Sequence, residues 1–323
     1  MSLIRARQGS FSISCVIPCC NEAQNVALLL PQLRQVLDGL TADWEIVLVD
    51  DGSTDATATL IPAWTSQPGV RALQLSRNFG KEAALTAGFQ AARGDAVIAM
   101  DADLQHPPQL LPEFVARWQA GADVVYAVRA DRSGESWFKR VGARLFYSLM
   151  ATDGQFDVPA DAGDFRLLDR AAVVALLALP ERSRFMKGLY AWIGFDAVAI
   201  PYTPQPRAHG TSHFDALRLI RLSLDGLTSF TVWPLRAVSA AGFVLAVVGF
   251  AYGAFISIDY FLNGNLVSGW TTIVVGMTFY FGMLMISLGI LGEYIGRIFE
   301  EVKGRPLYVV RREWGQGLDD TRS

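Results

Sequence analysis

The sequence predicts an α/β domain with a mostly parallel sheet, followed by two transmembrane helices. Short apolar runs alternate with helical patterns in the first part of the chain, which is typical of a parallel sheet covered by helices. Two long uncharged runs follow, and each is long enough to cross a membrane. The composition agrees, because 51% of the residues are hydrophobic and only 18% are charged, which is too apolar for an ordinary soluble enzyme.

The strands and helices of the α/β part are expected in strict alternation. The strands should span 12–18, 45–49, 70–75, 96–100 and 123–128, and the helices 25–40, 54–64, 81–92 and 107–119. In such sheets, ligands bind beyond the carboxyl ends of the strands. Polar pairs stand at three of these ends: Asn21 with Glu22, Asp50 with Asp51, and Asp101 with Asp103.

The uncharged runs cover 237–258 and 260–292, and the second is densest over 270–291. At about 1.5 Å per residue, each reaches across a hydrocarbon core of about 30 Å. A pair of buried core helices is the alternative interpretation. We predict a catalytic domain at 1–212, an amphipathic juxtamembrane helix at 213–234, transmembrane helices at 235–258 and 270–292, an external hairpin at 259–269 and a C-terminal tail at 293–323.

The Lys and Arg residues near these helices predict the orientation in the membrane. The connection over 259–269 contains neither residue type. Basic residues flank the two runs on their other sides: Arg218, Arg221, Arg236, Arg297, Lys303, Arg305, Arg311 and Arg312. The positive-inside rule therefore predicts a multi-pass protein of the cytoplasmic membrane, with the catalytic domain and both termini in the cytoplasm. Small-residue spacings at Gly249/Gly253 and Gly292/Gly296 would permit a homo-oligomer.

Several partners and sites are not expected. A formal charge of -3 and a pI near 5.7 argue against a nucleic-acid binder that works by overall basicity. The three cysteines, Cys15, Cys19 and Cys20, form no disulfide framework and lack the partners of a zinc site. Residues 1–10 lack the apolar core of a cleavable signal peptide. The pattern over 136–150 fits a helix in the membrane interface or one packed on the domain's own core.

A metal site is expected directly after the fourth strand. Asp101 and Asp103 can share one divalent cation, and Gln105 adds a neutral oxygen ligand two residues later. Mg²⁺ and Mn²⁺ prefer such oxygen ligands together with phosphate oxygens. The alternative is a solvated turn with helix-capping aspartates. The position at a strand end, beside other acidic loops, favours the metal.

These segments together resemble family 2 glycosyltransferases with the GT-A fold. The matching motifs are VIPCCNE at 16–22, VDDGSTD at 49–55, NFGK at 78–81 and DADLQHPP at 101–108. Within that family, GDFRLLD at 163–169, RFMKG at 184–188 and GEYIGRIFEEVKGRPLY at 292–308 resemble polyprenyl-phosphate glycosyltransferases. That group includes dolichol-phosphate mannose synthases and bactoprenol glucosyltransferases, and the two-helix tail is most similar to the bacterial members.

The resemblance implies roles for residues on the donor side. It places Pro18, Cys20 and Glu22 around the nucleotide base and ribose, although the family usually has Tyr at the position of Cys20. It implies that Asp50 and Asp51 read the uracil and ribose, that Lys81 lies near the nucleotide, and that Arg129 faces the sugar diphosphate. The metal and the diphosphate are implied at Asp101, Ala102, Asp103 and Gln105.

The resemblance also implies an acceptor side. Asp164 and Arg166 match a catalytic motif there, and Asp164 acts either as a general base or by orienting Arg166 or the sugar. The residues implied at the lipid phosphate are Arg166, Arg184, Lys187, Arg207 and Ser212.

The implied reaction is inverting transfer of a hexose, with glucose favoured, from a UDP-sugar to undecaprenyl phosphate. The partners are then the sugar nucleotide, the polyprenyl phosphate and membrane lipids, and the cofactor is Mg²⁺ or Mn²⁺. GDP-mannose, a UDP-N-acetylhexosamine or a UDP-aminoarabinose derivative are alternative donors. A catalytically inactive membrane scaffold is a further alternative, against which the intact Asp101, Asp103 and Gln105 argue.

Overall fold

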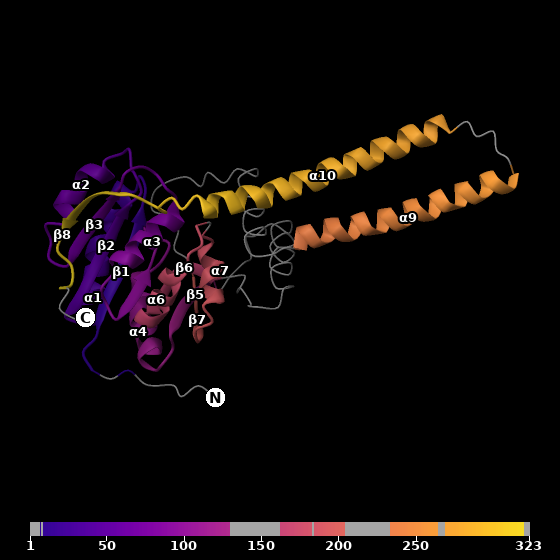
Figure 1. The fold of residues 1–323 in the computed structure, drawn as a ribbon. Coiled ribbons are helices and arrows are strands. Elements are labelled where there is room, and N and C mark those ends of the chain that lie inside the picture. The colour runs from indigo at the N-terminus through magenta and orange to yellow at the C-terminus, as the bar shows by residue number, and fades with distance from the viewer. Residues whose placement is uncertain are drawn as a thin grey trace. The chain divides into compact units, whose positions relative to one another are not determined.

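The structure is a computed structural model that describes residues 7, 9–129, 162–182, 184–203, 233–263 and 269–319. It divides into two compact units, one of Met1–Leu219 with Pro306–Ser323 and one of Ile220–Arg305. Figure 1 shows an α/β unit and a pair of long helices. The predicted helix over 136–150, residues 213–232 of the juxtamembrane helix and residues 264–268 of the hairpin lie outside the described residues.

The α/β unit is built on an eight-stranded sheet in the order β7-β5-β6-β4-β1-β2-β3-β8. The strands are β1 Ser12–Cys19, β2 Asp43–Asp50, β3 Val70–Leu75, β4 Ala96–Ala99, β5 Val124–Arg129, β6 Ala162–Asp169, β7 Ala197–Tyr202 and β8 Val310–Gly315. Pairing is parallel in the centre, between β4, β1, β2 and β3, and between β5 and β7. It is antiparallel where β6 joins β4 to β5 and where β8 joins β3. The sheet is therefore mixed, with a parallel core.

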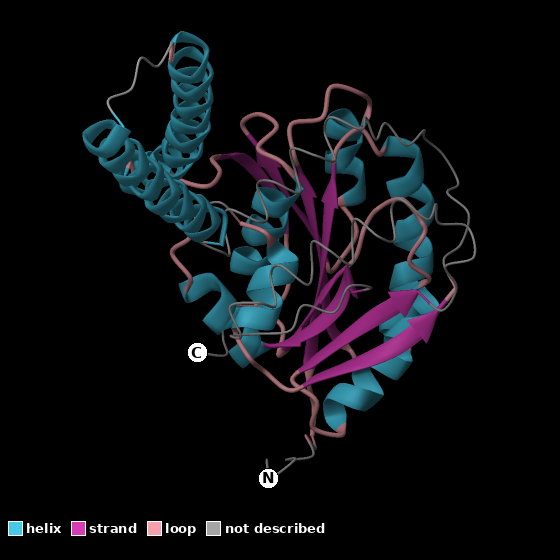
Figure 2. Ribbon diagram, turned by 90° about the vertical axis from the view of Figure 1, so that its right-hand side faces the viewer, coloured by secondary structure: helices cyan, strands magenta, loops and turns pink. Residues whose placement is uncertain are grey.

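Helices cover both faces of this sheet (Figure 2). They are α1 Ala23–Asp38, α2 Thr57–Trp64, α3 Lys81–Ala91, α4 Leu111–Gln119 after the short η1 Pro108–Leu110, α6 Arg170–Ala178 and α7 Met186–Trp192. The alternation predicted over 12–128 is confirmed, with element ends shifted by a few residues. The helix expected from 54 begins at Thr57, whose backbone N–H donates to Asp55 Oδ1 at 2.9 Å, so Asp55 ends the preceding loop.

The strands of the parallel core are buried on both faces. All eight residues of β1 are buried, and Ile13, Val16 and Ile17 have no exposed surface. This explains why these strands read as continuous apolar runs and not as an alternating pattern. The later strands lack this continuous apolar pattern. The Pro-rich sequence of 201–206 suggests an extended linker, but its first two residues, Pro201 and Tyr202, belong to β7.

The C-terminal segment differs from the predicted tail over 293–323. Residues 310–315 form β8, which pairs with β3, and Ser76 N–H donates to the carbonyl of Val309 at 2.8 Å. The carbonyl of Leu318 accepts from Arg93 Nη1 at 2.6 Å, and its N–H donates to the buried Glu45 at 3.2 Å. Residues 310–315 are thus part of the eight-stranded sheet, and Leu318 is hydrogen-bonded to it.

The second unit contains α9 Trp233–Asn263 and α10 Trp270–Val302. The segments Ala237–Phe255 and Val275–Val302 are long and apolar enough to cross a membrane, and neither is buried within the protein. Large side chains such as Phe250 and Phe261 are more than three-quarters exposed. Such surface on two long helices is characteristic of lipid-facing segments and contradicts the alternative of buried core helices.

Candidate active site

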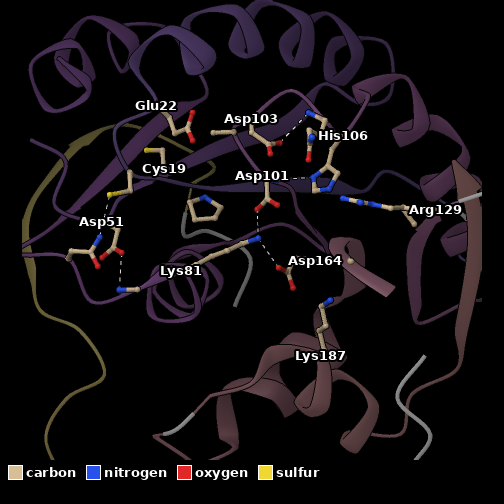
Figure 3. Close-up of a pocket in the computed structure, with 18 of the residues that line it drawn as sticks. Cys19, Glu22, Asp51, Lys81, Asp101, Asp103, His106, Arg129, Asp164 and Lys187 are labelled. Carbon is tan, nitrogen blue, oxygen red and sulfur yellow. Dashed lines mark hydrogen bonds and ion pairs between the residues drawn. The ribbon is translucent and has the colours of Figure 1, made fainter. Parts of the chain in front are cut away.

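A cavity of about 680 Å³ opens at the carboxyl ends of the central strands (Figure 3). The loops after β1, β2, β3 and β4 contribute to it, together with the start of β6, the end of β5 and α7. It brings together these predicted residues: Pro18, Cys20, Glu22, Asp51, Lys81, Asp101, Ala102, Asp103, Gln105, Arg129, Asp164 and Lys187. The polar clusters expected at separate strand ends therefore share one site.

The loops after β1 and β2 are joined by side-chain hydrogen bonds. Asn21, which has a left-handed backbone at φ 59°, accepts through Oδ1 from the backbone N–H groups of Thr54 and Asp55. Its own N–H donates to Ser53 Oγ at 2.9 Å. An Asn tolerates this conformation better than most residues, which accounts for its place in the motif.

The two aspartates at the end of β2, Asp50 and Asp51, have different surroundings. Asp51 lines the cavity, and its carboxylate accepts from the N–H groups of Phe79 and Gly80 at 2.7 and 2.9 Å, which fixes the start of α3. Asp50 is fully buried and is not among the lining residues, although the resemblance implied a nucleotide contact. It accepts from Ser53 N–H and Gln74 Nε2, both at 3.0 Å, so it supports the loop.

Cys20 lies on the cavity wall, where the family usually has Tyr. Asn78 Nδ2 donates to its sulfur at 3.3 Å. Partial burial raises the pKa of the Cys20 thiol, so it is protonated at neutral pH. It contributes a small neutral surface to the end of the cavity formed by the loops after β1 and β2.

The loop after β4 is held in one conformation by its neighbours. Asp103 Oδ1 accepts from Gln105 N–H at 3.1 Å, and Leu104 between them has φ 62°. The N–H of Asp101 donates to Nδ1 of His106 at 3.1 Å, and this ring stacks on Phe165 with centroids 4.8 Å apart. Burial lowers the pKa of His106, which agrees with an unprotonated Nδ1 acceptor.

The same loop fits a divalent metal ion. Asp101, Asp103 and Gln105 face one cavity and offer two carboxylates and an amide oxygen. The described residues hold no group of three or more His, Cys, Asp or Glu that would enclose a metal by itself. Mg²⁺ and Mn²⁺ commonly complete such partial sites with water and phosphate oxygens, so the donor set suits a metal bound together with a diphosphate.

Lys81 connects this loop to β6. Its Nζ lies 2.5 Å from Asp101 Oδ1 and 2.7 Å from Asp164 Oδ2. Burial disfavours the charged ammonium, but the two carboxylates outweigh that effect and raise the pKa of Lys81. Burial likewise opposes ionisation of Asp164, yet Lys81 and then Arg166 lower its pKa. Both groups are therefore charged at neutral pH.

Comparison with known proteins identifies the family. The family model described as glycosyl transferase family 2 matches residues 14–177. The chain belongs to glycosyltransferase family 2. An uncharacterised glycosyltransferase of Synechocystis is 42% identical over 95% of this chain and 96% of its own length. The bactoprenol glucosyl transferase of the Shigella flexneri SfII prophage is 42% identical, over 93% and 97%. A prophage homologue of that enzyme in Escherichia coli is 41% identical, over 93% and 98%.

This family 2 glycosyltransferase has the GT-A fold, as its mostly parallel sheet and family model indicate. The acceptor-side residues do not all reach the cavity. Arg166 is buried, donates from Nη2 to the carbonyl of Gly163 at 2.6 Å and lies 3.5 Å over the ring of Tyr190. Arg184 donates to the carbonyls of Leu176 and Leu179 and is not a lining residue. Arg207 and Ser212 lie outside the described residues.

The glycosyltransferase cavity also includes residues that sequence reasoning did not select. These are Cys19, Asn78, Gly80, His106, Ala127, Gly163 and Tyr202. Cys19, Asn78, Gly80, His106 and Gly163 lie inside motifs that the sequence analysis had already identified, so only their position in those motifs pointed to them. Tyr202 had no such signal. It lies in β7, beside β5, and its hydroxyl oxygen accepts a hydrogen bond from the side chain of Arg129.

Proposed function

We propose that this glycosyltransferase transfers glucose from UDP-glucose to undecaprenyl phosphate, with inversion at the anomeric carbon. The observation that supports this proposal most strongly is the similarity to proteins named bactoprenol glucosyl transferases, at 41–42% identity over 93% of this chain. That similarity extends through both apolar helices, and a lipid-linked acceptor agrees with a catalytic unit joined to such helices.

The donor lies at the end of the cavity nearest β1 and β2 in this proposal. Pro18, Cys20, Glu22 and Asp51 surround the base and ribose, and Arg129 faces the sugar diphosphate. Asp101, Asp103 and Gln105 would hold Mg²⁺ or Mn²⁺ together with the diphosphate. Such a metal would offset the negative charge on the departing UDP.

The acceptor enters beside Asp164 and Lys187, which line the other end of the cavity. A phosphate oxygen of the lipid attacks the anomeric carbon as the bond to the diphosphate breaks and UDP leaves. The phosphate is already anionic at neutral pH, so it needs orientation more than deprotonation. Lys187 supplies a positive charge for it, Asp164 orients the sugar, and the buried Arg166 positions Asp164 electrostatically.

The membrane arrangement follows the charge distribution. We place α9 and α10 across the cytoplasmic membrane as a hairpin, with the catalytic unit and both termini in the cytoplasm. The basic residues beyond α10, among them Arg305 and Arg311, lie on that side. The headgroup of a polyprenyl phosphate stays at the membrane surface, and this arrangement brings the enzyme to it.

The experiment is transfer of radiolabelled glucose from UDP-glucose into the lipid fraction by the full chain in membranes that contain undecaprenyl phosphate. Label should appear only with Mg²⁺ or Mn²⁺ and disappear in excess EDTA. Asp103→Asn keeps an oxygen that can accept from Gln105 N–H but removes a charge, so it should reduce transfer at least about 100-fold while insertion is unchanged.

Competing donors are tested in the same assay. GDP-mannose, UDP-N-acetylglucosamine and a UDP-aminoarabinose derivative should each give much less labelled lipid than UDP-glucose. A higher rate with one of these would reassign the sugar. No labelled lipid with any donor would contradict the proposed reaction and favour the inactive scaffold.

A further inference from the structure

One lysine bridges the two halves of the cavity. Lys81 opens α3, while Asp101 follows β4 and Asp164 lies in β6, the strand next to β4 in the sheet. Figure 3 shows its ammonium group between the two carboxylates, 2.5 Å from Asp101 and 2.7 Å from Asp164. A single cation therefore forms ion pairs with two carboxylates, one in the loop after β4 and one in β6.

The Asp101 carboxylate faces two competing cations. Its Oδ1 is within ion-pair distance of Lys81, and a divalent ion that uses Asp101 must share or displace that ammonium. Like charges a few ångströms apart repel, and the repulsion is strong in a partly buried site. A lysine held at Asp101 is therefore expected to lower the affinity of the loop for a free metal ion.

The backbone before Lys81 is held in place, whereas the Lys81 side chain is partly exposed. The adjoining backbone is fixed, because Asp51 accepts from the N–H groups of Phe79 and Gly80. The Lys81 side chain is 42% exposed, so its ammonium can leave Asp101 without unpacking the core. The side chain of Asp164 is only 15% exposed, and it remains a partner at the same lysine.

We propose that Lys81 serves as the counter-ion of Asp101 when no nucleotide is bound. By occupying Asp101, Lys81 prevents tight metal binding until a nucleoside diphosphate is also bound. The diphosphate supplies the negative charge that allows the metal and the ammonium to lie in the same cavity. Lys81 then leaves Asp101, stays with Asp164 and directs its freed N–H donors to the diphosphate or sugar. Loading of the donor is thereby linked to the acceptor half of the site. This inference rests on the proposed metal-dependent use of a sugar nucleotide.

The test is Mn²⁺ binding to the full chain in detergent, followed by the electron paramagnetic resonance signal of free Mn²⁺, with and without UDP. Wild type should bind Mn²⁺ weakly alone and much more tightly with UDP. Lys81→Met should bind Mn²⁺ alone about tenfold more tightly than wild type, as expected for loss of one competing charge-assisted contact. The gain on adding UDP should shrink correspondingly.

Two further variants separate contact from net charge. Lys187→Met removes the same charge from the same cavity and should change nucleotide-free Mn²⁺ affinity less than about threefold, since charges that are not in contact are better screened. Lys81→Arg keeps the charge and should resemble wild type. UDP binding in the presence of Mn²⁺ verifies that each variant is folded.

The inference is overturned if Lys81→Met leaves nucleotide-free Mn²⁺ affinity unchanged or weakens it, or if Lys187→Met has the same effect as Lys81→Met. It is also overturned if wild type binds Mn²⁺ equally well with and without UDP. The titration contains no sugar and no lipid acceptor. Failure of glucose transfer to undecaprenyl phosphate would therefore contradict the proposed function and leave this result standing.

Discussion

Two neighbouring carboxyl groups, Asp164 and Glu82, have their pKa values moved in opposite directions. Burial opposes the charge on Asp164, but Lys81 and Arg166 lower its pKa. Burial, and after it the charge of Asp164, raise the pKa of Glu82 to about 8, against the opposing effects of Lys81 and Lys187. At neutral pH one carboxylate is therefore ionised at the cavity while its neighbour is held as a neutral acid that accepts from the N–H of Met186.

Glu82 should make the stability of the fold depend on pH. Its pKa rises from an ordinary 4.5 to about 8 in the folded state, so the folded state binds the proton more tightly and stability falls as the pH rises across that interval. Glu82→Gln mimics the neutral acid and should raise the free energy of unfolding by roughly 4–5 kcal/mol at pH 8.5, at about 1.4 kcal/mol for each pH unit between 4.5 and about 8.

The readout is the thermal midpoint of the full chain in detergent. Glu82→Gln should raise it by roughly 10 °C at pH 8.5 and by much less at pH 5. Lys187→Gln serves as the comparison, because it alters charge in the same neighbourhood without removing a raised carboxyl pKa. An equal shift at both pH values would refute the protonated state of Glu82.

At the scale of elements, β8 completes the catalytic sheet from the far end of the chain. It pairs with β3 over Arg71–Leu75, and Trp314 packs against the core under that edge. The segment just after β8 is connected to the sheet through Glu45, a fully buried residue of β2 that accepts from the N–H of Leu318. Glu45 also accepts from Ser14 Oγ at 2.6 Å and lies 3.0 Å from Arg71 Nε. A buried carboxylate that loses such partners is costly.

A chain that stops after Val309 should therefore have a less stable catalytic unit, although it keeps every cavity residue. At about 1 kcal/mol per hydrogen bond, the loss of the ladder should cost more than about 2 kcal/mol. We expect faster cleavage by trypsin and a thermal midpoint lower by roughly 5 °C or more. A chain that stops after Asp319 keeps the described contacts of β8 and should behave like the full chain. Equal stability of both truncations would show that β8 is dispensable.

For the whole molecule, the membrane hairpin gives a prediction about sidedness. An alkaline phosphatase reporter inserted between 264 and 268 should be active, because the connection is expected outside the cytoplasm. Green fluorescent protein fused after Ser323 should fluoresce, because the C-terminus is expected inside. Exchanging the two reporters should silence both. Activity of the same reporter at both positions would rule out a two-span hairpin.

The sequence by itself determined the features that depend on neighbouring residues. Parallel strands are buried on both faces, so the runs that became β1 to β5 could be found, and the aspartates at their ends could be assigned to one edge of the sheet. The two apolar helices could be found in the same way, from length and charge alone. The strand β8 could not, because an exposed edge strand such as VRREWG has neither a continuous nor an alternating apolar pattern.

The tertiary structure alone decided which side chains meet. Asp50 and Arg166 stand in motifs beside residues that line the cavity, yet packing buries them, and they support the site from outside it. Lys81, Asp101 and Asp164 belong to three separate parts of the chain, and the pairing of β4 with β6 places the Lys81 ammonium 2.5 Å from Asp101 and 2.7 Å from Asp164. Motifs and periodicity report local geometry, whereas contacts between distant segments depend on how the strands are ordered and packed.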